Sequence, residues 1–179
     1  MSGIKTNSSL KNDFVRWILS EISKLVSESN ESIPMPKPQK HKEYVLQEFK
    51  NKCPYTGKPL SMDDIELDHI IPFNKDYCGL HLRGNLVATS SETNNEKKSQ
   101  NYKNFIKSFP GNAQNRIKKI QAYMKANGYD EDLFDSLRIQ DFVNDQYKKF
   151  EQYLDEVMKA LTKEMERINN QLKQPQKAK

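Results

Sequence analysis

The amino-acid sequence predicts an α+β fold that is mostly helical. In this fold a small core of two strands and a helix lies between an N-terminal helix pair and C-terminal helices, one of which is long. Turn residues and short β-branched runs occupy only the middle of the chain, whereas apolar residues recur at helical spacing on both sides of it. Charged residues make up 30% of the chain and apolar residues 35%, which favours helices with solvated faces over a thick, sheet-rich core. A length of 179 residues suits one compact domain with an appendage.

Two helices are predicted before the central segment. The first covers about residues 9–29, where apolar residues recur at helical spacing and a serine can cap the first turn. A Pro-rich run over residues 34–38 cannot be helical and is predicted to be an extended linker. The second helix runs from about residue 39 to residue 52, and His41 is expected on its surface.

The central segment is predicted to contain a turn, two short strands and a helix. Residues 53–60 carry Pro and Gly at turn positions and are expected to form a tight knuckle. The first strand covers residues 65–71 and ends at Pro72, and a loop leads to the second strand at residues 86–88. A polar helix then runs from about residue 90 to about residue 101.

The C-terminal region is predicted to be helical. A basic helix covers residues 112–127, and Gly128 is a good helix stop. A long helix follows from about residue 139 to residue 172, with apolar residues spaced alternately by four and three and one additional step of four. This heptad-like stripe could pack against its own domain or form a dimer. It consists of Val143, Tyr147, Phe150, Leu154, Val157, Leu161, Met165, Ile168 and Leu172.

These segments divide the chain into four parts. Residues 1–38 hold the N-terminal helix and the Pro-rich linker, and residues 39–110 hold the strand–strand–helix core. Residues 111–173 form the C-terminal helical region, and residues 174–179 form a tail that is predicted to be disordered.

The composition argues against a membrane-spanning or secreted class of protein. No apolar run is long enough to span a bilayer, and the start of the chain lacks the apolar stretch of a signal peptide. A cytoplasmic location is therefore expected. In that compartment the two cysteines, Cys53 and Cys78, are expected to be reduced and packed rather than bridged.

Positive charge is concentrated in one part of the chain. The segment from Lys97 to Tyr129 contains no Asp or Glu, and aromatic residues lie among its basic ones. Such a local basic block indicates a polyanionic partner, most commonly nucleic acid. Solvated helix faces explain the same charges equally well. The basic residues are Lys97, Lys98, Lys103, Lys107, Arg116, Lys118, Lys119 and Lys125.

Four polar residues in the central segment suit the hydrolysis of a phosphodiester bond. Asp68 and Asn94 offer hard oxygen ligands for a divalent cation such as Mg²⁺. His69 is a natural base for the attacking water, because the pKa of free imidazole lies close to physiological pH. Asn85 can bond backbone across the loop and so hold His69 in place. Because neighbouring residues of a regular strand point to opposite faces, a bend or bulge is expected to bring Asp68 and His69 to one phosphate.

Basic residues around this set are candidates for DNA contacts. Lys97 lies one helical turn beyond Asn94 and could meet a phosphate. In the loop before the second strand, His81 and Arg83 could contact phosphate, and His81 could stand beside the metal. Ordinary loop side chains without a function are the alternative for both. The candidates for DNA binding are Arg83, Lys97, Lys98, Lys103 and Lys107.

The central pattern resembles the HNH, or ββα-metal, nuclease superfamily, in the variant whose third signature residue is Asn. That family has an Asp-His pair on the first strand, Asn at the start of the second, Asn or His on the helix, and Lys three residues later. The matching residues here are Asp68, His69, Asn85, Asn94 and Lys97. The knuckle and the run at residues 68–73 are also similar to the HNH domain of CRISPR effector nucleases. The resemblance covers about residues 52–104.

The resemblance implies a role for each matching residue. Asp68 and Asn94 would bind a single catalytic metal, Mg²⁺ or alternatively Mn²⁺. His69 would activate water, and Asn85 would be structural. The metal would stabilise the leaving oxygen, so that cleavage leaves a 5′-phosphate and a 3′-hydroxyl.

One feature of many family members is missing from this sequence. Those members pin the knuckle to the helix with zinc, which is bound by two Cys-x-x-Cys pairs. Hydroxyls are poor zinc ligands, so no structural zinc is expected here. The four matching positions hold Cys53, Thr56, Ser90 and Thr93.

The sequence therefore predicts a metal-dependent endonuclease that cuts double-stranded DNA, of a restriction type. A homodimer through the long C-terminal helix would bring two sites to the two strands. A phage or mobile-element nicking nuclease would need no dimer. A DNA-binding module without catalysis is the alternative of another class, although every motif position holds a chemically competent residue. A protein-interaction adaptor would rest on the C-terminal stripe alone.

Overall fold

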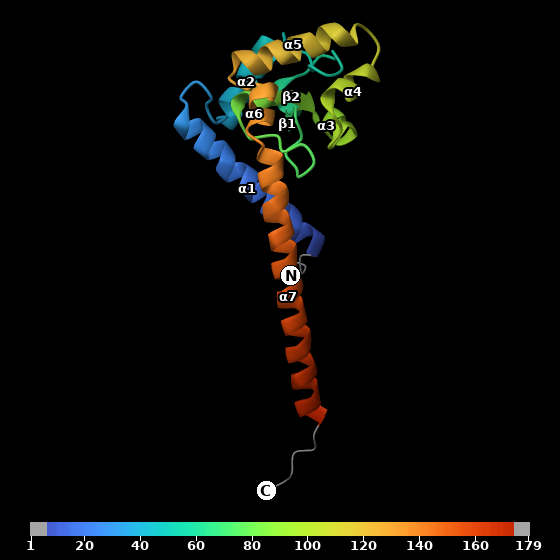
Figure 1. The fold of residues 1–179 in the computed structure, drawn as a ribbon. Helices are drawn as coiled ribbons and strands as arrows, with labels where there is room; N and C mark the ends of the chain where they lie inside the picture. The colour runs from blue at the N-terminus through green and yellow to red at the C-terminus, as the bar shows by residue number, and fades with distance from the viewer. Residues whose placement is uncertain (1–6, 174–179) are drawn as a thin grey trace.

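Seven α-helices and one two-stranded antiparallel sheet make up the described part of the chain, residues 7–173 of a computed structural model (Figure 1). The mostly helical α+β fold class is thereby confirmed. Two short 3-10 helices, η1 and η2, precede the strands. In chain order the elements are α1 (Asn7–Ser29), α2 (Pro38–Glu48), η1 (Met62–Asp64), β1 (Ile65–His69), η2 (Arg83–Asn85), β2 (Leu86–Ser90), α3 (Ser91–Lys97), α4 (Tyr102–Lys107), α5 (Ala113–Ala126), α6 (Glu131–Ser136) and α7 (Ile139–Lys173).

The two strands and α3 form the predicted strand–strand–helix core. β1 and β2 pair in regular antiparallel register, from Ile65 opposite Ser90 to His69 opposite Leu86. Ser90 then caps α3, because its hydroxyl accepts the Thr93 backbone N–H. α3 packs against both strands, and α2 also contacts both. The start of β1 pairs with the end of β2 and therefore lies close to the start of α3.

The knuckle before β1 is a closed turn. Cys53 N donates to Lys58 O at 2.8 Å, and Gly57 N donates to Cys53 O at 2.8 Å. Gly57 has φ +76°, a conformation that residues with a side chain rarely adopt. The turn directs Tyr55 into the core, where its side chain is fully buried with its ring edge against Phe105. The knuckle is thus attached to the core mainly through one aromatic ring.

Several boundaries differ from the sequence predictions. α2 ends at Glu48, because Lys50 and Asn51 both adopt φ 54° and stop the helix. The helix predicted to reach residue 101 ends at Lys97. The short helices α4 and α6 were not predicted, since six residues carry too little periodicity to be recognised.

The predicted exposure of His41 is wrong. His41 is buried rather than on the surface, and its Nε2 lies 3.2 Å from Leu86 O. Among the aromatic residues of the basic block, Tyr102 and Phe105 belong to the core, and Phe109 is partly buried against it. These rings hold α4 on the domain and are not free to stack on bases.

The long helix α7 leaves the domain. Its first part packs on α1, where the rings of Phe14 and Phe150 stack at 4.1 Å and Lys11 pairs with Glu151 at 2.6 Å. The remainder extends away from the core (Figure 1). Leu161, Met165 and Ile168 are exposed there. The tail that was predicted to be disordered, residues 174–179, lies outside the described residues. Among the helices within residues 7–173, none is both long and apolar enough to cross a membrane.

Candidate functional site

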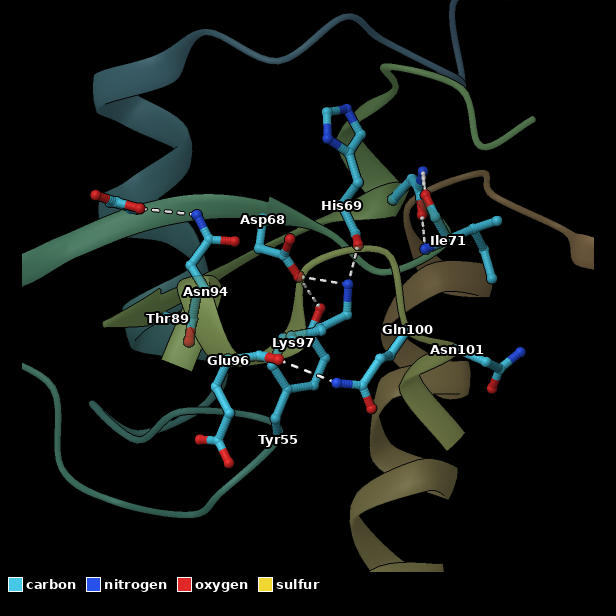
Figure 2. A network of polar contacts seen from close by, with 12 residues as sticks. Tyr55, Asp68, His69, Ile71, Thr89, Asn94, Glu96, Lys97, Gln100 and Asn101 are labelled. Atoms are coloured by element: carbon cyan, nitrogen blue, oxygen red, sulfur yellow. Dashed lines mark hydrogen bonds and ion pairs between the residues drawn. The ribbon is translucent and has the colours of Figure 1, made fainter. Parts of the chain in front are cut away.

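Two side chains from different parts of the chain hold the Asp68 carboxylate. The Tyr55 hydroxyl donates to Oδ2 of Asp68 at 2.7 Å, and Nζ of Lys97 lies 2.8 Å from the same oxygen (Figure 2). Burial raises the pKa of Asp68, and the charge of Lys97 opposes that effect. Burial, together with the Asp68 charge, also raises the pKa of Tyr55 well above its usual value, so the phenol remains a donor. Both of these side-chain contacts use the same carboxylate oxygen, Oδ2.

Lys97 is buried, contrary to the expectation that it meets a phosphate. Its side chain is only 1% exposed, and its ammonium binds Asp68 and the His69 carbonyl oxygen, the latter at 2.8 Å. A buried ammonium needs a counter-charge and hydrogen bonds, and these two acceptors supply them. In this geometry Lys97 stabilises the carboxylate and the end of β1 rather than a DNA phosphate.

Asn94 lies beside the carboxylate with its amide oriented by a third residue. Nδ2 of Asn94 donates to Oε2 of Glu66 at 2.7 Å. The carboxamide oxygen therefore points the other way, toward Asp68 (Figure 2). Glu66 and Asp68 are two residues apart on β1 and share one face of the strand. The structure thus gathers one carboxamide and two carboxylates on this face.

Asn85 clamps the loop that joins the strands. Its Oδ1 accepts from Ile71 N at 2.8 Å, and its Nδ2 donates to Ile71 O at 3.0 Å and to Leu80 O at 2.9 Å. The loop is packed so closely that a Cβ at Gly79 would lie 2.0 Å from Ile71 O. Asn85 therefore makes the cross-loop backbone bonds expected of it, immediately after the position of His69.

The His69 imidazole lies in a different environment from the carboxylate. Its Nε2 is 3.0 Å from Nδ1 of His81, and its ring stacks on Phe73 with centroids 4.9 Å apart and an interplanar angle of 10°. Burial, followed by the positive charges of His81 and Lys97, lowers the pKa of His69 to about 3. The imidazole is therefore neutral at physiological pH.

The expected bend or bulge in the first strand is wrong. Pairing is regular through His69, so consecutive side chains leave β1 on opposite faces. Figure 2 shows the His69 ring pointing away from the Asp68 carboxylate. Asn94 binds Glu66 on the strand face that also carries Asp68, whereas His69 lies on the other side of the strand end.

The remaining basic candidates occupy three kinds of position. Lys98 and Lys107 are exposed. Nζ of Lys103 lies 3.2 Å from a carboxylate oxygen of Glu131. The Arg83 guanidinium stacks on the Tyr44 ring, 4.1 Å from its centroid, on the side of α2. Of these four residues, Lys98 and Lys107 are therefore the exposed ones that no described ion pair or ring contact engages.

The donor set near Asp68 fits a hard divalent cation. Within residues 7–173 no three His, Cys, Asp or Glu side chains cluster as a metal site. Mg²⁺, however, usually takes one or two protein oxygens, keeps several waters and binds substrate phosphate. A carboxylate beside a carboxamide oxygen supplies those protein ligands. At the positions where relatives of this pattern hold zinc, Cys53 Sγ lies 3.5 Å from Thr89 Oγ1, and Ser90 Oγ donates to Thr93 Oγ1 at 2.9 Å.

Sequence reasoning missed three contributors to this site. Tyr55 was not named as a site residue, and Lys97 was assigned to a phosphate. Glu66 was not considered, although its place two residues before Asp68 puts it on the same strand face. That alternation was the available signal for Glu66. Nothing in the sequence identified the pairing of His69 with His81.

Comparison with known proteins agrees with this geometry. Residues 53–102 match the HNH endonuclease family, a segment that contains Asp68, His69, Asn85 and Asn94. The match confirms the resemblance of this segment to the HNH superfamily. No curated protein and no solved structure gives a significant match to the chain. The nearer similarity to CRISPR effector nucleases stays a prediction.

Proposed function

We propose that the chain is a metal-dependent endonuclease that hydrolyses phosphodiester bonds in double-stranded DNA. The observation that carries the proposal is the buried anchoring of Asp68 by Lys97 and Tyr55, directly beside the Asn94 carboxamide, within a segment of HNH type. A buried ion pair is seldom a gain in stability, because desolvation offsets the attraction. The Asp68–Lys97 pair therefore calls for an explanation other than stability, and a role in binding a metal through Asp68 is one that the family resemblance supports.

Asp68 and Asn94 would hold one Mg²⁺, with Mn²⁺ as the alternative. When bound, such an ion supplies charge stabilisation to the scissile phosphate and to the leaving 3′ oxygen. Lys97 and Tyr55 hold Oδ2 of Asp68, and Glu66 turns the oxygen of Asn94 toward Asp68. The protein thus presents two oxygens without rearranging either side chain.

His69 would take the proton from the attacking water. In an in-line displacement the incoming and the leaving oxygen lie on opposite sides of phosphorus. A base on one side of the strand end and the ligand pair on the other fits that requirement. The buried imidazole is neutral, so one of its ring nitrogens carries a free lone pair for that proton. Asn85 would keep the loop after His69 in place through its three backbone bonds.

Exposed lysines would hold the DNA backbone. Lys98 directly follows α3, the helix that carries Asn94. Lys107 is the last residue of α4, the next helix along the chain. Lys103 would bind phosphate after its ion pair with Glu131 breaks. That ion pair is partly exposed and therefore weak, so breaking it costs little. Arg83 would act from the side of α2, where it now stacks on Tyr44.

Metal removal is the direct test of the proposed activity. Purified protein is expected to convert supercoiled plasmid DNA to cut forms with Mg²⁺ and to leave it intact in excess EDTA, because the phosphate charge is then not neutralised. Agarose gels over time measure both forms. Restoring Mg²⁺ should restore cleavage. Cleavage that is unchanged in EDTA contradicts the metal assignment, whereas DNA binding without cleavage under either condition favours the non-catalytic DNA-binding module.

The same gels separate a restriction-type enzyme from a nicking enzyme. A domain with one active site cuts one strand, so a double-strand cut needs two copies or a second event. Linear product formed with little nicked intermediate favours a restriction-type role. Accumulated nicked circles favour the phage or mobile-element nicking nuclease.

A homodimer through α7 is part of the restriction-type proposal. The apolar stripe continues from Val143 and Phe150, which pack within the chain, to the exposed Leu161, Met165 and Ile168. An isolated helix end of this length is marginal in water without packing on its apolar side. A second copy of the same stripe would supply that packing.

Double substitution on the stripe tests the dimer. Leu161→Glu with Ile168→Glu is expected to shift the mass in solution from dimer to monomer, because the added charges cannot be buried in an apolar interface. Multi-angle light scattering measures this mass. Gln152→Glu with Asn170→Glu adds the same charge on the opposite, exposed face and should leave the dimer intact. A wild-type chain that is monomeric at tens of micromolar contradicts the dimer.

A further inference from the structure

A second imidazole meets His69 from the loop that joins the strands. Nδ1 of His81 lies 3.0 Å from Nε2 of His69, with the two rings tilted by 53°. Phe73 contacts both rings, stacked on His69 and edge-on to His81. The three side chains form one packed cluster on the face of β1 opposite to the Asp68 carboxylate.

The backbone around His81 is held at several points. His81 N donates to the buried Ser23 hydroxyl of α1 at 2.8 Å. Its neighbours Leu80 and Leu82 are fully buried, and Leu80 O accepts from Nδ2 of Asn85. The backbone that carries the His81 ring is therefore fixed by Ser23 of α1 and by Asn85.

A hydrogen bond between two neutral imidazole rings requires that one of the two facing nitrogens carries a proton and the other does not. Either His69 donates from Nε2 to an unprotonated Nδ1 of His81, or His81 donates from Nδ1 to an unprotonated Nε2 of His69. The first arrangement places both rings in the Nε2–H tautomer, which is the more stable form of a free neutral histidine. It leaves Nδ1 of His69 unprotonated. The second leaves Nδ1 of His69 protonated and unable to accept.

We propose that His81 is a positioning residue that accepts the Nε2–H of His69 and thereby makes Nδ1 of His69 the nitrogen that receives the proton of water. This inference rests on the proposed role of His69 as the base. Water transfers one proton to Nδ1, its oxygen forms the bond to phosphorus, and the 3′ oxygen leaves with the electrons of the broken P–O bond. The imidazolium keeps its Nε2–H on His81, which stabilises the new charge, as the third member of a catalytic triad does for its histidine.

The tautomer can be measured without any nuclease assay. The chain has three histidines, so a long-range ¹H–¹⁵N correlation spectrum contains three imidazole systems that single variants can assign. At neutral pH, His69 is expected to show a protonated Nε2 and an unprotonated Nδ1. His41 serves as an internal reference because it is buried elsewhere, against Leu86 and Tyr123. A His69 ring protonated on Nδ1 overturns the proposal.

Two substitutions of His81 separate positioning from packing. His81→Asn keeps an acceptor near the place of Nδ1, whereas His81→Leu keeps bulk and removes the acceptor. His81→Leu is expected to lower kcat of plasmid cleavage by about 10- to 100-fold, with KM within about twofold, because the orienting partner of the reactive ring is lost. His81→Asn should recover most of kcat.

The outcomes distinguish this inference from the proposed function. Equal losses in His81→Asn and His81→Leu, or a wild-type rate in His81→Leu, contradict the positioning role while cleavage itself stands. Absence of cleavage by the wild-type chain contradicts the proposed function. In that case the tautomer of His69 in the wild-type spectrum still decides whether His81 accepts the hydrogen bond.

Discussion

His69→Ala is expected to lower the rate of Mg²⁺-dependent plasmid cleavage by about 10²- to 10⁴-fold, the range for loss of a general base. The substitution leaves the Asp68 carboxylate on Lys97 and Tyr55, on the other side of the strand end. Affinity for DNA should therefore stay within about twofold of the wild-type value. Single-turnover gel assays measure the rate, and fluorescence anisotropy with Ca²⁺ in place of Mg²⁺ measures the affinity.

Asn95→Ala is the matched control for this experiment. Asn95 is exposed and follows Asn94 on α3. Its removal should leave the rate near the wild-type value, because none of the described hydrogen bonds or ion pairs joins its side chain to Asp68, Glu66 or His69. A His69→Ala variant that cleaves as fast as the Asn95→Ala variant would rule out His69 as the base.

Lys97→Met is expected to lower the free energy of unfolding by about 3–5 kcal/mol, because it leaves the Asp68 charge buried without its partner. For a chain of this size the melting temperature should fall by roughly 6–20 °C. Differential scanning calorimetry at neutral pH measures the change. Methionine retains most of the buried length of the lysine side chain, so lost packing contributes little.

Two further variants make the stability prediction specific. Lys98→Met removes the neighbouring exposed lysine and should change the melting temperature by no more than about 2 °C. Adding Asp68→Asn to Lys97→Met should recover a large part of the loss, since no unpaired charge then remains buried. If the double variant is no more stable than Lys97→Met alone, the effect does not arise from the Asp68–Lys97 pair.

Local signals made much of the core predictable. The Ser90 cap of α3, the Gly and Pro residues of the knuckle and the starts of β1 and β2 follow from residues within a few positions of each other. The separation of Asp68, Asn85 and Asn94 along the chain was sufficient to identify the HNH segment, which the family match confirms. The roles of these residues stay predictions.

Contacts between distant segments were not predictable from the sequence. A lysine one turn after Asn94 is ordinarily solvated, and its burial depends on Tyr55 from the knuckle, more than 40 residues earlier. His41 was expected at the surface because α2 has few apolar residues, yet the Tyr123 ring of α5 and β2 enclose it. The expectation of a bulge failed because it assumed that the base and the carboxylate must share a face.

The anchoring of Asp68 also determines how much of the chain a working site requires. The proposed metal ligands and base end at Asn94, but the ammonium beside the Asp68 carboxylate belongs to Lys97, the last residue of α3, and the phenol beside it comes from the turn that precedes β1. A polypeptide that ends before residue 97, or one whose N-terminal turn has not closed, would contain Asp68, His69, Asn85 and Asn94 and still lack the two contacts that hold the carboxylate. A minimal fragment with the geometry of this site therefore has to include both the turn at residues 53–60 and the whole of α3.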